Sequence, residues 1–445
     1  MPLLDTAMEF AKLFSIVLSL GIGSFALALR YRVTYSWSHP AVIFAIFWFA
    51  MTILPLVGVW NMPVEPIALA YILGAVAAFG VPAVLVNWKS AAASAIQRNS
   101  TMNSRNYSTL LLVGLQVIVV ATIVANLHHQ GFPIRSYIEN PLGTSTAYLN
   151  ASSEGHLKPF PLASVGFILL YVAAALGGLA AVRSNNGVER AFIFAITFVP
   201  SLMHILFYSL KGTVFLAGAV FFGGVLAGRV QRGDLSLINR ATIKVALGLL
   251  VPAVALLVFA MLARPGQGMW GQDEQAAKVV YYLKSYAFGH LYAFSDWFSS
   301  YFLGGGTMAY TDPGRLTFGY WTFMALGEYV NPEYNLPPGY YDEYYGVDKV
   351  LKSNIFTIFR GMIYDFTLIG SFLFMGAAGA ICSYAYRRML LVNNPVVSQT
   401  IFIFAIGAIY QSYIFSMFAW SSTIAAIVLT AALLSAQKFF ETRAK

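Results

Sequence analysis

Two charged residues, Arg360 and Asp365, lie inside a long apolar stretch that reads SNIFTIFRGMIYDFTLIG. A charge at the centre of a membrane helix costs about 2.5–3.5 kcal/mol, so it usually marks a function or has a partner. A continuous helix over 354–386 would be about 50 Å long, which exceeds the hydrocarbon core. We therefore expect Arg360 at the outer interface, where its guanidinium group would bind an anion, and Asp365 deeper. The alternative is a snorkelling arginine and a carboxylate that a neighbouring helix satisfies.

Three further cations lie in turns on the side of the membrane where we expect Arg360. Lys211 stands in YSLKGTVF, between two apolar runs with only Gly212 to turn the chain, and Arg135 and Arg315 lie beside Pro/Gly turns. Guanidinium and ammonium groups stabilise phosphate oxygens through charge-assisted hydrogen bonds. The four cations together predict a diphosphate site, although each alone is also typical of a solvated loop residue.

Three residues are candidate general bases. His290 and Asp296 lie in GHLYAFSDWF, and Glu328 lies in MALGEYV. Histidine titrates near neutral pH, and burial tunes carboxylates upward. We rank His290 first and Glu328 second, and a reaction without a base remains open. Aromatic residues nearby would stack on sugar rings or else form the interfacial belt: Tyr292, Trp297, Trp321 and Tyr364.

We expect no cofactor and no metal. The only cysteine, Cys382, excludes an intrachain disulfide and a cysteine-based metal site. His128 and His129 have no carboxylate or cysteine partner at ligand spacing. The glycine run LGGGT lacks the Lys-Ser/Thr that completes a nucleotide-binding loop.

Membrane helices must position these residues. Of the 445 residues, 58% are hydrophobic and 10% are charged, and the mean hydropathy is +0.68. An ordinary soluble domain is about 25% charged, so the composition excludes a water-soluble fold and predicts an all-α polytopic membrane protein. The net charge of +9 lies in small groups beside apolar runs, which indicates membrane topology rather than binding of nucleic acid.

The chain contains about eleven apolar runs long enough to cross a bilayer. Sixteen of the 27 Lys and Arg residues lie in every second loop and at the C-terminus. The positive-inside rule places that side in the cytoplasm and the N-terminus outside. The first run lacks a basic leader, which argues against a cleavable signal peptide. The runs are 13–29, 41–60, 66–87, 109–126, 162–182, 191–210, 213–227, 245–263, 355–385, 398–416 and 418–437.

We divide the chain into a bundle of eight spans (1–263), a large outer loop (264–353) and three more spans (354–445). The loop is too long to be an idle connection. Its first half has helical apolar spacing and predicts two short amphipathic helices on the outer face. The Tyr-, Pro- and Gly-rich stretch 327–349 predicts a mobile flap that covers a sugar groove and excludes water.

Three pieces follow one another within about 200–385: LKGT, then YAFGHLYAFSDWF, then TFGYWTFMALGEY with SNIFTIFRGMIYDFTLIGSFLFMGAAGAI. Together they resemble the bacterial O-antigen polymerases of the Wzy type, or oligosaccharide repeat unit polymerases. The most specific piece runs from Asn354 to Gly370, with an Asn-aromatic-Thr-aromatic run and a Tyr/Asp-aromatic cluster. Thr367 stands where this family commonly has glycine, and Lys211 where many members have arginine.

The resemblance implies a metal-independent, GT-C-like glycosyltransferase of the bacterial inner membrane. It would transfer a growing glycan from undecaprenyl diphosphate onto the non-reducing end of an undecaprenyl-diphosphate-linked repeat unit, at the periplasmic face. Arg360 and Lys211 would hold the diphosphate, and Asn354 and Asp365 would support the site. Its partners would be the lipid-linked oligosaccharide, membrane lipids, a chain-length regulator and a flippase.

Two other functions fit the sequence. An O-antigen ligase uses the same donor but delivers the glycan to the lipid A core, and would differ in its outer loops. A polysaccharide flippase or other secondary transporter would have charged or broken helices that meet at the membrane midplane. Here the polar residues gather toward one face, and the sequence shows no fixed-period internal repeat.

Overall fold

The computed structural model describes residues 2–34, 36–98, 109–184, 186–238, 254–262, 274–330 and 341–443. The chain forms two compact units. Unit 1 comprises Met1–Ala93, Tyr281–Arg388 and Ala408–Ser421, and unit 2 comprises Ser94–Val280, Met389–Gly407 and Ser422–Lys445. Each unit is built from three separate segments of the chain. The sequence-based division instead cuts the chain into three consecutive pieces at 263 and 353, and it stays a prediction.

Nine helices in the described part of the chain are long and apolar enough to cross a membrane, which confirms a mostly helical, multi-pass membrane protein. The count of eleven stays a prediction, because the run 245–263 lies mainly outside the described residues and 398–416 corresponds to the shorter α15 (Val396–Gln411). The nine are α1 (Pro2–Arg32), α2 (Pro40–Gly58), α3 (Pro66–Val84), α5 (Thr109–His129), α8 (Pro161–Arg183), α9 (Gly187–Tyr208), α10 (Lys211–Gln231), α14 (Thr357–Leu391) and α16 (Ser421–Arg443).

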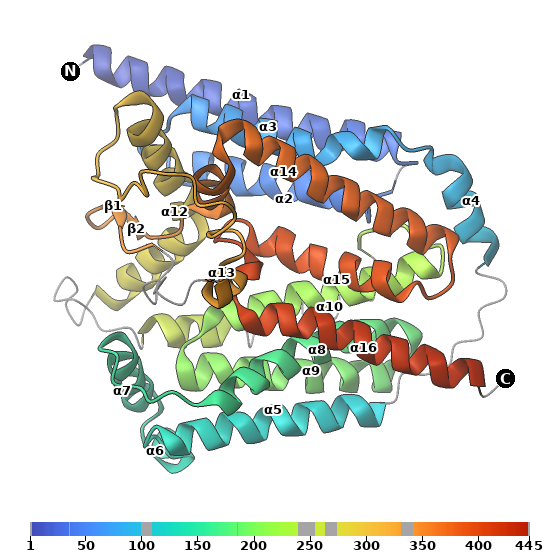
Figure 1. Cartoon of the computed structure of the whole chain (residues 1–445). Helices are drawn as coiled ribbons and strands as arrows, with labels where there is room; N and C mark the ends of the chain where they lie inside the picture. Colours follow the sequence, from blue (N-terminus) through green and yellow to red (C-terminus); the bar gives the residue numbers. More distant parts are fainter. Residues whose placement is uncertain are drawn as a thin grey trace. The chain divides into compact units, whose positions relative to one another are not determined.

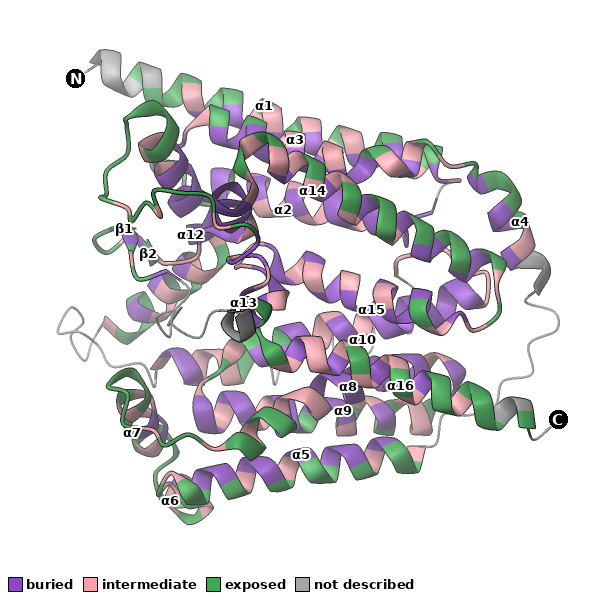
Figure 2. Ribbon diagram, viewed as in Figure 1, coloured by how far each residue is buried: buried purple, intermediate pink, exposed green. Residues whose placement is uncertain are grey.

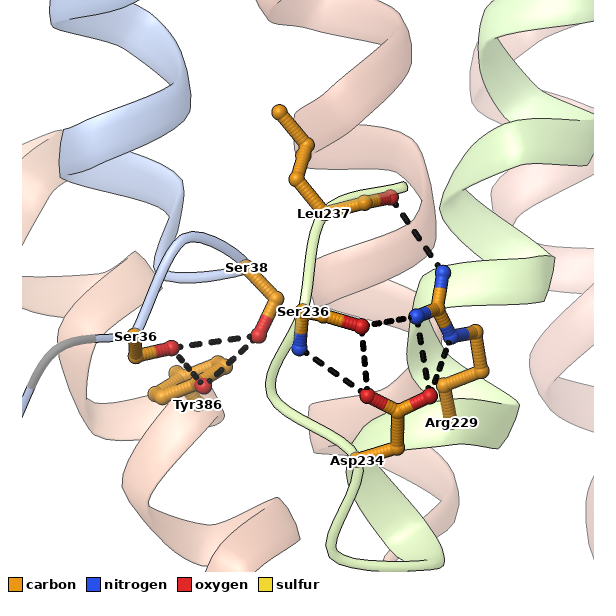
Figure 3. Close-up of polar contacts among 7 residues, drawn as sticks. All are labelled: Ser36, Ser38, Arg229, Asp234, Ser236, Leu237 and Tyr386. Carbon is orange, nitrogen blue, oxygen red and sulfur yellow. Dashed lines mark hydrogen bonds and ion pairs between the residues drawn. The ribbon is translucent and has the colours of Figure 1, made fainter. Parts of the chain in front are cut away.

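In unit 1, α1, α2, α3 and α14 run side by side (Figure 1). A side chain at Gly379 of α14 would collide with the carbonyl of Phe79 in α3, so glycine permits this close approach. The α1–α2 loop is tied to α14 where the Tyr386 hydroxyl bonds to the hydroxyls of Ser36 and Ser38 at 2.7 and 2.9 Å (Figure 3). The remaining elements of the unit are α12 (Gln275–Leu303, from Tyr281 on), α13 (Met324–Val330), β1 (Tyr345–Val347), β2 (Leu351–Ser353) and η2 (Met417–Ala419), with α4 (Trp88–Arg98) at its boundary.

Exposed apolar side chains form a stripe along α1 (Figure 2). They recur at helical spacing, so they lie on one face of the helix. A stripe of this kind would be unfavourable in water and is suited to lipid. It consists of Phe10, Leu13, Val17, Leu20 and Leu27.

The first half of the long loop forms one continuous helix, α12, where the sequence predicted two short ones. That prediction was wrong because the apolar positions keep their helical period through Gly289 and no proline interrupts them. A side chain at Gly289 would collide with Ser353, so the glycine makes room for the neighbouring chain rather than ending the helix. The loop also holds an antiparallel hairpin of β1 and β2, with Gly346 opposite Lys352.

In unit 2, α8 and α10 approach closely because glycines face each other. A side chain at Gly178 would collide with the Phe221 carbonyl, and one at Gly224 with the Ala175 carbonyl. The α9–α10 turn is made by Ser209, whose φ is 53°, and not by Gly212, which lies inside α10. The short helices α6 (Ile134–Glu139) and α7 (Pro141–Ser153) follow the end of α5, and residues 254–262 are helical (Figure 1).

Arg229 near the end of α10 is 4% exposed. Its Nε donates to Asp234 at 2.9 Å, Nη1 donates to the Leu237 carbonyl at 3.3 Å, and Nη2 donates to the Ser236 hydroxyl (Figure 3). These bonds close the turn that follows the helix. A cation at a helix C-terminus is also favoured by the helix dipole.

Candidate functional site

Arg360 lies in the first turn of α14 with its side chain 1% exposed. Its guanidinium carbon is 4.1 Å from the ring centre of Tyr341 and 4.4 Å from that of Phe356. Such contacts stabilise a desolvated cation by cation–π attraction. Three more rings complete this aromatic cage at 5.3–5.5 Å: Tyr310, Trp297 and Tyr364.

Glu343 forms an ion pair with Arg360, with 3.0 Å between Nη2 and Oε1. The same oxygen accepts a hydrogen bond from the Thr311 amide at 2.8 Å. Burial alone would raise the pKa of Glu343, but the Arg360 charge and these hydrogen bonds hold it below the usual value of 4.5. Nη1 of Arg360 is buried and has no hydrogen-bond partner among the residues that the structure describes.

Asp296 is half-buried and bonds to the loop after α12. Its carboxylate accepts hydrogen bonds from the Tyr310 hydroxyl at 2.7 Å and from the amide and hydroxyl of Thr307 at 2.9 and 3.0 Å. Burial and the neighbouring carboxylate raise the pKa of Tyr310. Tyr310 therefore links Asp296 to the Arg360 cage, and Asp296 is the candidate base that the structure places beside it.

Asp365, five residues after Arg360 in α14, binds the loop at 317–322. Its carboxylate accepts hydrogen bonds from the Thr317 hydroxyl at 2.6 Å, the Trp321 amide at 3.0 Å, and the amide and hydroxyl of Thr322, both at 2.6 Å. Asp365 is 1% exposed. These bonds fix the loop at 317–322 against α14 and offset the cost of burying the carboxylate.

α14 is interrupted at Thr367, so the expectation of one continuous helix was wrong. Thr367 has φ 66° and ψ 177°, a conformation found almost only for glycine, which costs other residues about 1–3 kcal/mol. Its hydroxyl accepts a hydrogen bond from the Gly370 amide at 3.3 Å and so caps the second half of the helix. The strained residue is the one that stands where the resembled family commonly has glycine.

Two of the four predicted aromatic residues, Trp297 and Tyr364, close around the cation rather than lining an open groove. Trp297 is 0% and Tyr364 2% exposed, and the Trp297 indole donates to the Tyr364 hydroxyl at 2.8 Å. Trp321 is half-buried and stacks on Tyr341 with 5.1 Å between ring centres. The Asn354 side chain donates a hydrogen bond to the Tyr341 carbonyl at 3.4 Å and so helps to hold Tyr341, a residue of the aromatic cage, in place.

His290 and Tyr292 lie away from this cluster and pack against α2. Nε2 of His290 is 2.9 Å from the Met51 carbonyl, and burial lowers the pKa of His290 to about 4. The Tyr292 hydroxyl contacts Val59 at 2.7 Å and accepts a hydrogen bond from Lys12 at 2.8 Å. Both are 0% exposed, so the expectations of a base titrating near neutral pH and a sugar-facing ring are not met in this structure.

The four predicted cations are divided between the units. Unit 1 holds Arg360 and Arg315, which is exposed. Unit 2 holds Lys211, the first residue of α10, and Arg135, whose exposed ion pair with Glu139 is worth about 0.5 kcal/mol at most.

Two predictions concern residues that the structure does not describe in full. The side chain of Glu328 lies outside the described residues, as does much of the flap (331–340). The role of Glu328 and the mobility of the flap therefore stay predictions.

Sequence reasoning missed several residues of the cage. Glu343, Tyr341 and Tyr310 were treated as members of a flap or were not singled out. The available signal was an acidic residue among tyrosines, which is a suitable partner for a buried arginine. Lys12 was also missed, because it stands just before the first apolar run. It is 1% exposed and donates to the Val59 and Met62 carbonyls at 3.1 and 3.0 Å.

Comparison of the sequence with protein families, curated proteins and solved structures finds no match.

Proposed function

We propose that the chain is an O-antigen polymerase of the Wzy type. It would move a growing glycan from undecaprenyl diphosphate onto an undecaprenyl-diphosphate-linked repeat unit, at the periplasmic face of a bacterial inner membrane. The observation that carries the proposal is Arg360, a buried cation in an aromatic cage with one guanidinium nitrogen lacking a partner among the described residues.

The position of Arg360 in its helix favours an anionic ligand. The N-terminus of a helix carries partial positive charge, which disfavours a cation there and attracts phosphate groups. A diphosphate bound to Arg360 would compensate both positive charges. Glu343 supplies one negative charge in the present arrangement, so it stands where phosphate oxygens would bind. Binding of the donor phosphate to Nη2 of Arg360 would require that the ion pair with Glu343 opens.

The remaining groups have matching roles. The acceptor hydroxyl gives its proton to a base, for which Asp296 is the best-placed described candidate, and its oxygen bonds to the anomeric carbon of the donor glycan. The bond between that carbon and the diphosphate oxygen breaks, and the electron pair leaves with the diphosphate. Arg360 stabilises the charge that develops on this leaving group.

Incubation of the purified chain with undecaprenyl-diphosphate-linked repeat units, prepared from the source cells, tests the proposal. A polymerase yields a ladder of lipid-linked glycans that differ by one repeat. Transfer of glycan only after lipid A core is added would identify a ligase. Movement of intact lipid-linked repeats across vesicles without new glycosidic bonds would identify a flippase. Either of these results would refute the polymerase.

A further inference from the structure

Unit 2 contains a pocket of about 210 Å³ that none of the proposed site residues lines. It lies where the end of α5, the start of α8 and the end of α9 meet α7. Gly166 of α8 allows this arrangement, because a side chain there would collide with Thr122 of α5. The residues that matter for its chemistry are Asn126, Gln130, Tyr148, Phe167, His204 and Tyr208.

Aromatic rings form one wall of the pocket. The ring centres of Tyr148 and Tyr208 are 5.1 Å apart, those of Tyr208 and His204 are 5.3 Å apart, and those of His204 and Phe167 are 4.8 Å apart. Neighbouring planes are tilted by 32–37°. The four rings thus make a continuous apolar surface with polar atoms at its edges.

Two amide side chains, held in fixed orientations, also line the pocket. Asn126 donates to the Tyr208 hydroxyl at 3.0 Å and accepts from Gln130 at 3.3 Å. Gln130 is fixed in turn by the main chain of Lys158, with hydrogen bonds of 2.7 and 2.9 Å. The Asn126 amide also hydrogen-bonds the Tyr148 hydroxyl, so its oxygen retains one lone pair for a ligand, because an amide oxygen offers two acceptor sites.

His204 points to a missing partner. It is 2% exposed and lines the pocket, and its Nδ1 has no hydrogen-bond partner among the described residues. A buried polar atom without a partner is uncommon. Because Nδ1 itself is closed to solvent, a ligand hydroxyl would satisfy it only if the imidazole ring turns toward the pocket.

The lining favours a neutral ligand. Its one ionisable side chain that is charged at neutral pH belongs to Lys158, which is exposed and holds Gln130 through main-chain atoms. Pockets for drug-sized ligands have volumes of about 300–1,000 Å³. This pocket is smaller, so it suits a single ring. An apolar face combined with fixed hydrogen-bond groups at the edges matches a sugar ring, which has C–H faces and equatorial hydroxyls.

We propose that this pocket binds one uncharged sugar residue of a glycan. The inference rests on the proposed function only for the source of that sugar, which would be the lipid-linked glycan. The pocket would then hold a sugar residue away from the reacting bond, which adds binding energy and selects the repeat unit.

Saturation-transfer NMR on the full chain in lipid nanodiscs tests the pocket, since nanodiscs avoid detergents that carry sugars. The probes are methyl glycosides of glucose, galactose, mannose, rhamnose and N-acetylglucosamine. At least one methyl glycoside should give a saturation-transfer signal with the wild type. Asn126→Leu or His204→Phe should reduce that signal at least fivefold. Gln116→Leu is the control, because Gln116 is buried on the same helix but bonds to the Thr197 carbonyl outside the pocket.

Tyr148→Phe removes only one hydroxyl and keeps the test valid if the larger changes impair folding; it should weaken the signal of the bound sugar about threefold or less. Absence of saturation with all five probes, or equal signals in the pocket variants and Gln116→Leu, would overturn the inference. The result is independent of polymerisation. A pocket-dependent signal in a chain that makes no polymer would refute the proposed function alone, and polymer formation without such a signal would refute the pocket alone.

Discussion

Arg360 and Arg229 are both almost fully buried, but their surroundings differ. Each of the three side-chain nitrogens of Arg229 donates to an oxygen of the turn that follows α10 (Figure 3). Arg360 faces five aromatic rings, pairs with one carboxylate, and has a nitrogen without a partner among the described residues. Arg229 lies at a helix C-terminus and Arg360 at a helix N-terminus, where the dipole disfavours a cation.

We interpret Arg229 as an arginine that completes the fold and propose that Arg360 binds an anion. The environment of Arg229 explains its burial without a ligand. Arg360 makes fewer hydrogen bonds: Nε donates to the Tyr364 hydroxyl at 3.4 Å, Nη2 pairs with Glu343, and Nη1 has no partner among the described residues. A diphosphate would supply the charge that the protein itself provides only in part.

Replacement of the two arginines should give the largest contrast. Arg360→Gln should lower the polymerisation rate about 100-fold or more, as expected when a group that stabilises the leaving charge is lost. Arg360→Lys should lower it about tenfold, because the charge remains but the planar fork is lost. Arg229→Gln should lower the melting temperature and leave the rate per folded molecule unchanged. Equal loss of rate in Arg360→Gln and Arg229→Gln would remove the distinction.

Replacement of the acidic partners of the two arginines, Glu343 and Asp234, should lower the stability of the protein by different amounts. Glu343→Gln should lower the free energy of unfolding by about 3–5 kcal/mol, because it leaves a buried charge unpaired. Asp234→Asn should cost about 1 kcal/mol or less, since the Asp234 side chain is 44% exposed. Undecaprenyl diphosphate should then stabilise Glu343→Gln more than the wild type in thermal unfolding. Equal ligand effects would show that Glu343 does not occupy the anion position.

Replacement of Thr367, the residue that interrupts α14, by glycine should increase the stability of the protein. Thr367→Gly should raise the free energy of unfolding by about 1 kcal/mol, because relief of strain exceeds the loss of the cap and of chain stiffness. Thr367→Ala keeps the strain and loses the cap, so it should lower stability by about 1 kcal/mol. Denaturant unfolding of both variants in the same detergent would measure this. A more stable Thr367→Ala than Thr367→Gly would contradict the strained conformation.

Of the predicted changes, the loss of stability on acidification should be the smallest. The folded-state pKa of Glu343 lies below its usual 4.5, so its stabilisation is complete above pH 4.5 and is lost as the pH falls through the folded pKa. His290, with a pKa lowered to about 4, adds a loss that begins below pH 6.5. The difference in melting temperature between wild type and Glu343→Gln cancels the histidine contribution. That difference should shrink only below pH 4.5, and shrinkage at higher pH would argue against the ion pair.

The sequence predicted the helical, multi-pass class because lipid imposes one dominant rule, an apolar run long enough to span. It also indicated Arg360 and Asp365, since charge in an apolar run is conspicuous. It did not indicate Glu343 or Tyr341, because contacts between a loop and a helix depend on the path of the loop, which has no periodic signature. The prediction of His290 as a general base also failed because of contacts that the sequence does not show. The residue type predicts a pKa near neutral, but burial against α2 overrides it.

Native mass spectrometry with undecaprenyl diphosphate tests most directly whether Arg360 binds the donor. The assay would compare the wild type with Arg360→Gln and with the matched control Arg229→Gln, each confirmed as folded by its melting curve. We expect the wild type and Arg229→Gln to retain the lipid diphosphate at equal occupancy and Arg360→Gln to lose it. Equal occupancy in all three proteins would show that the diphosphate binds elsewhere and that the caged arginine serves only the fold.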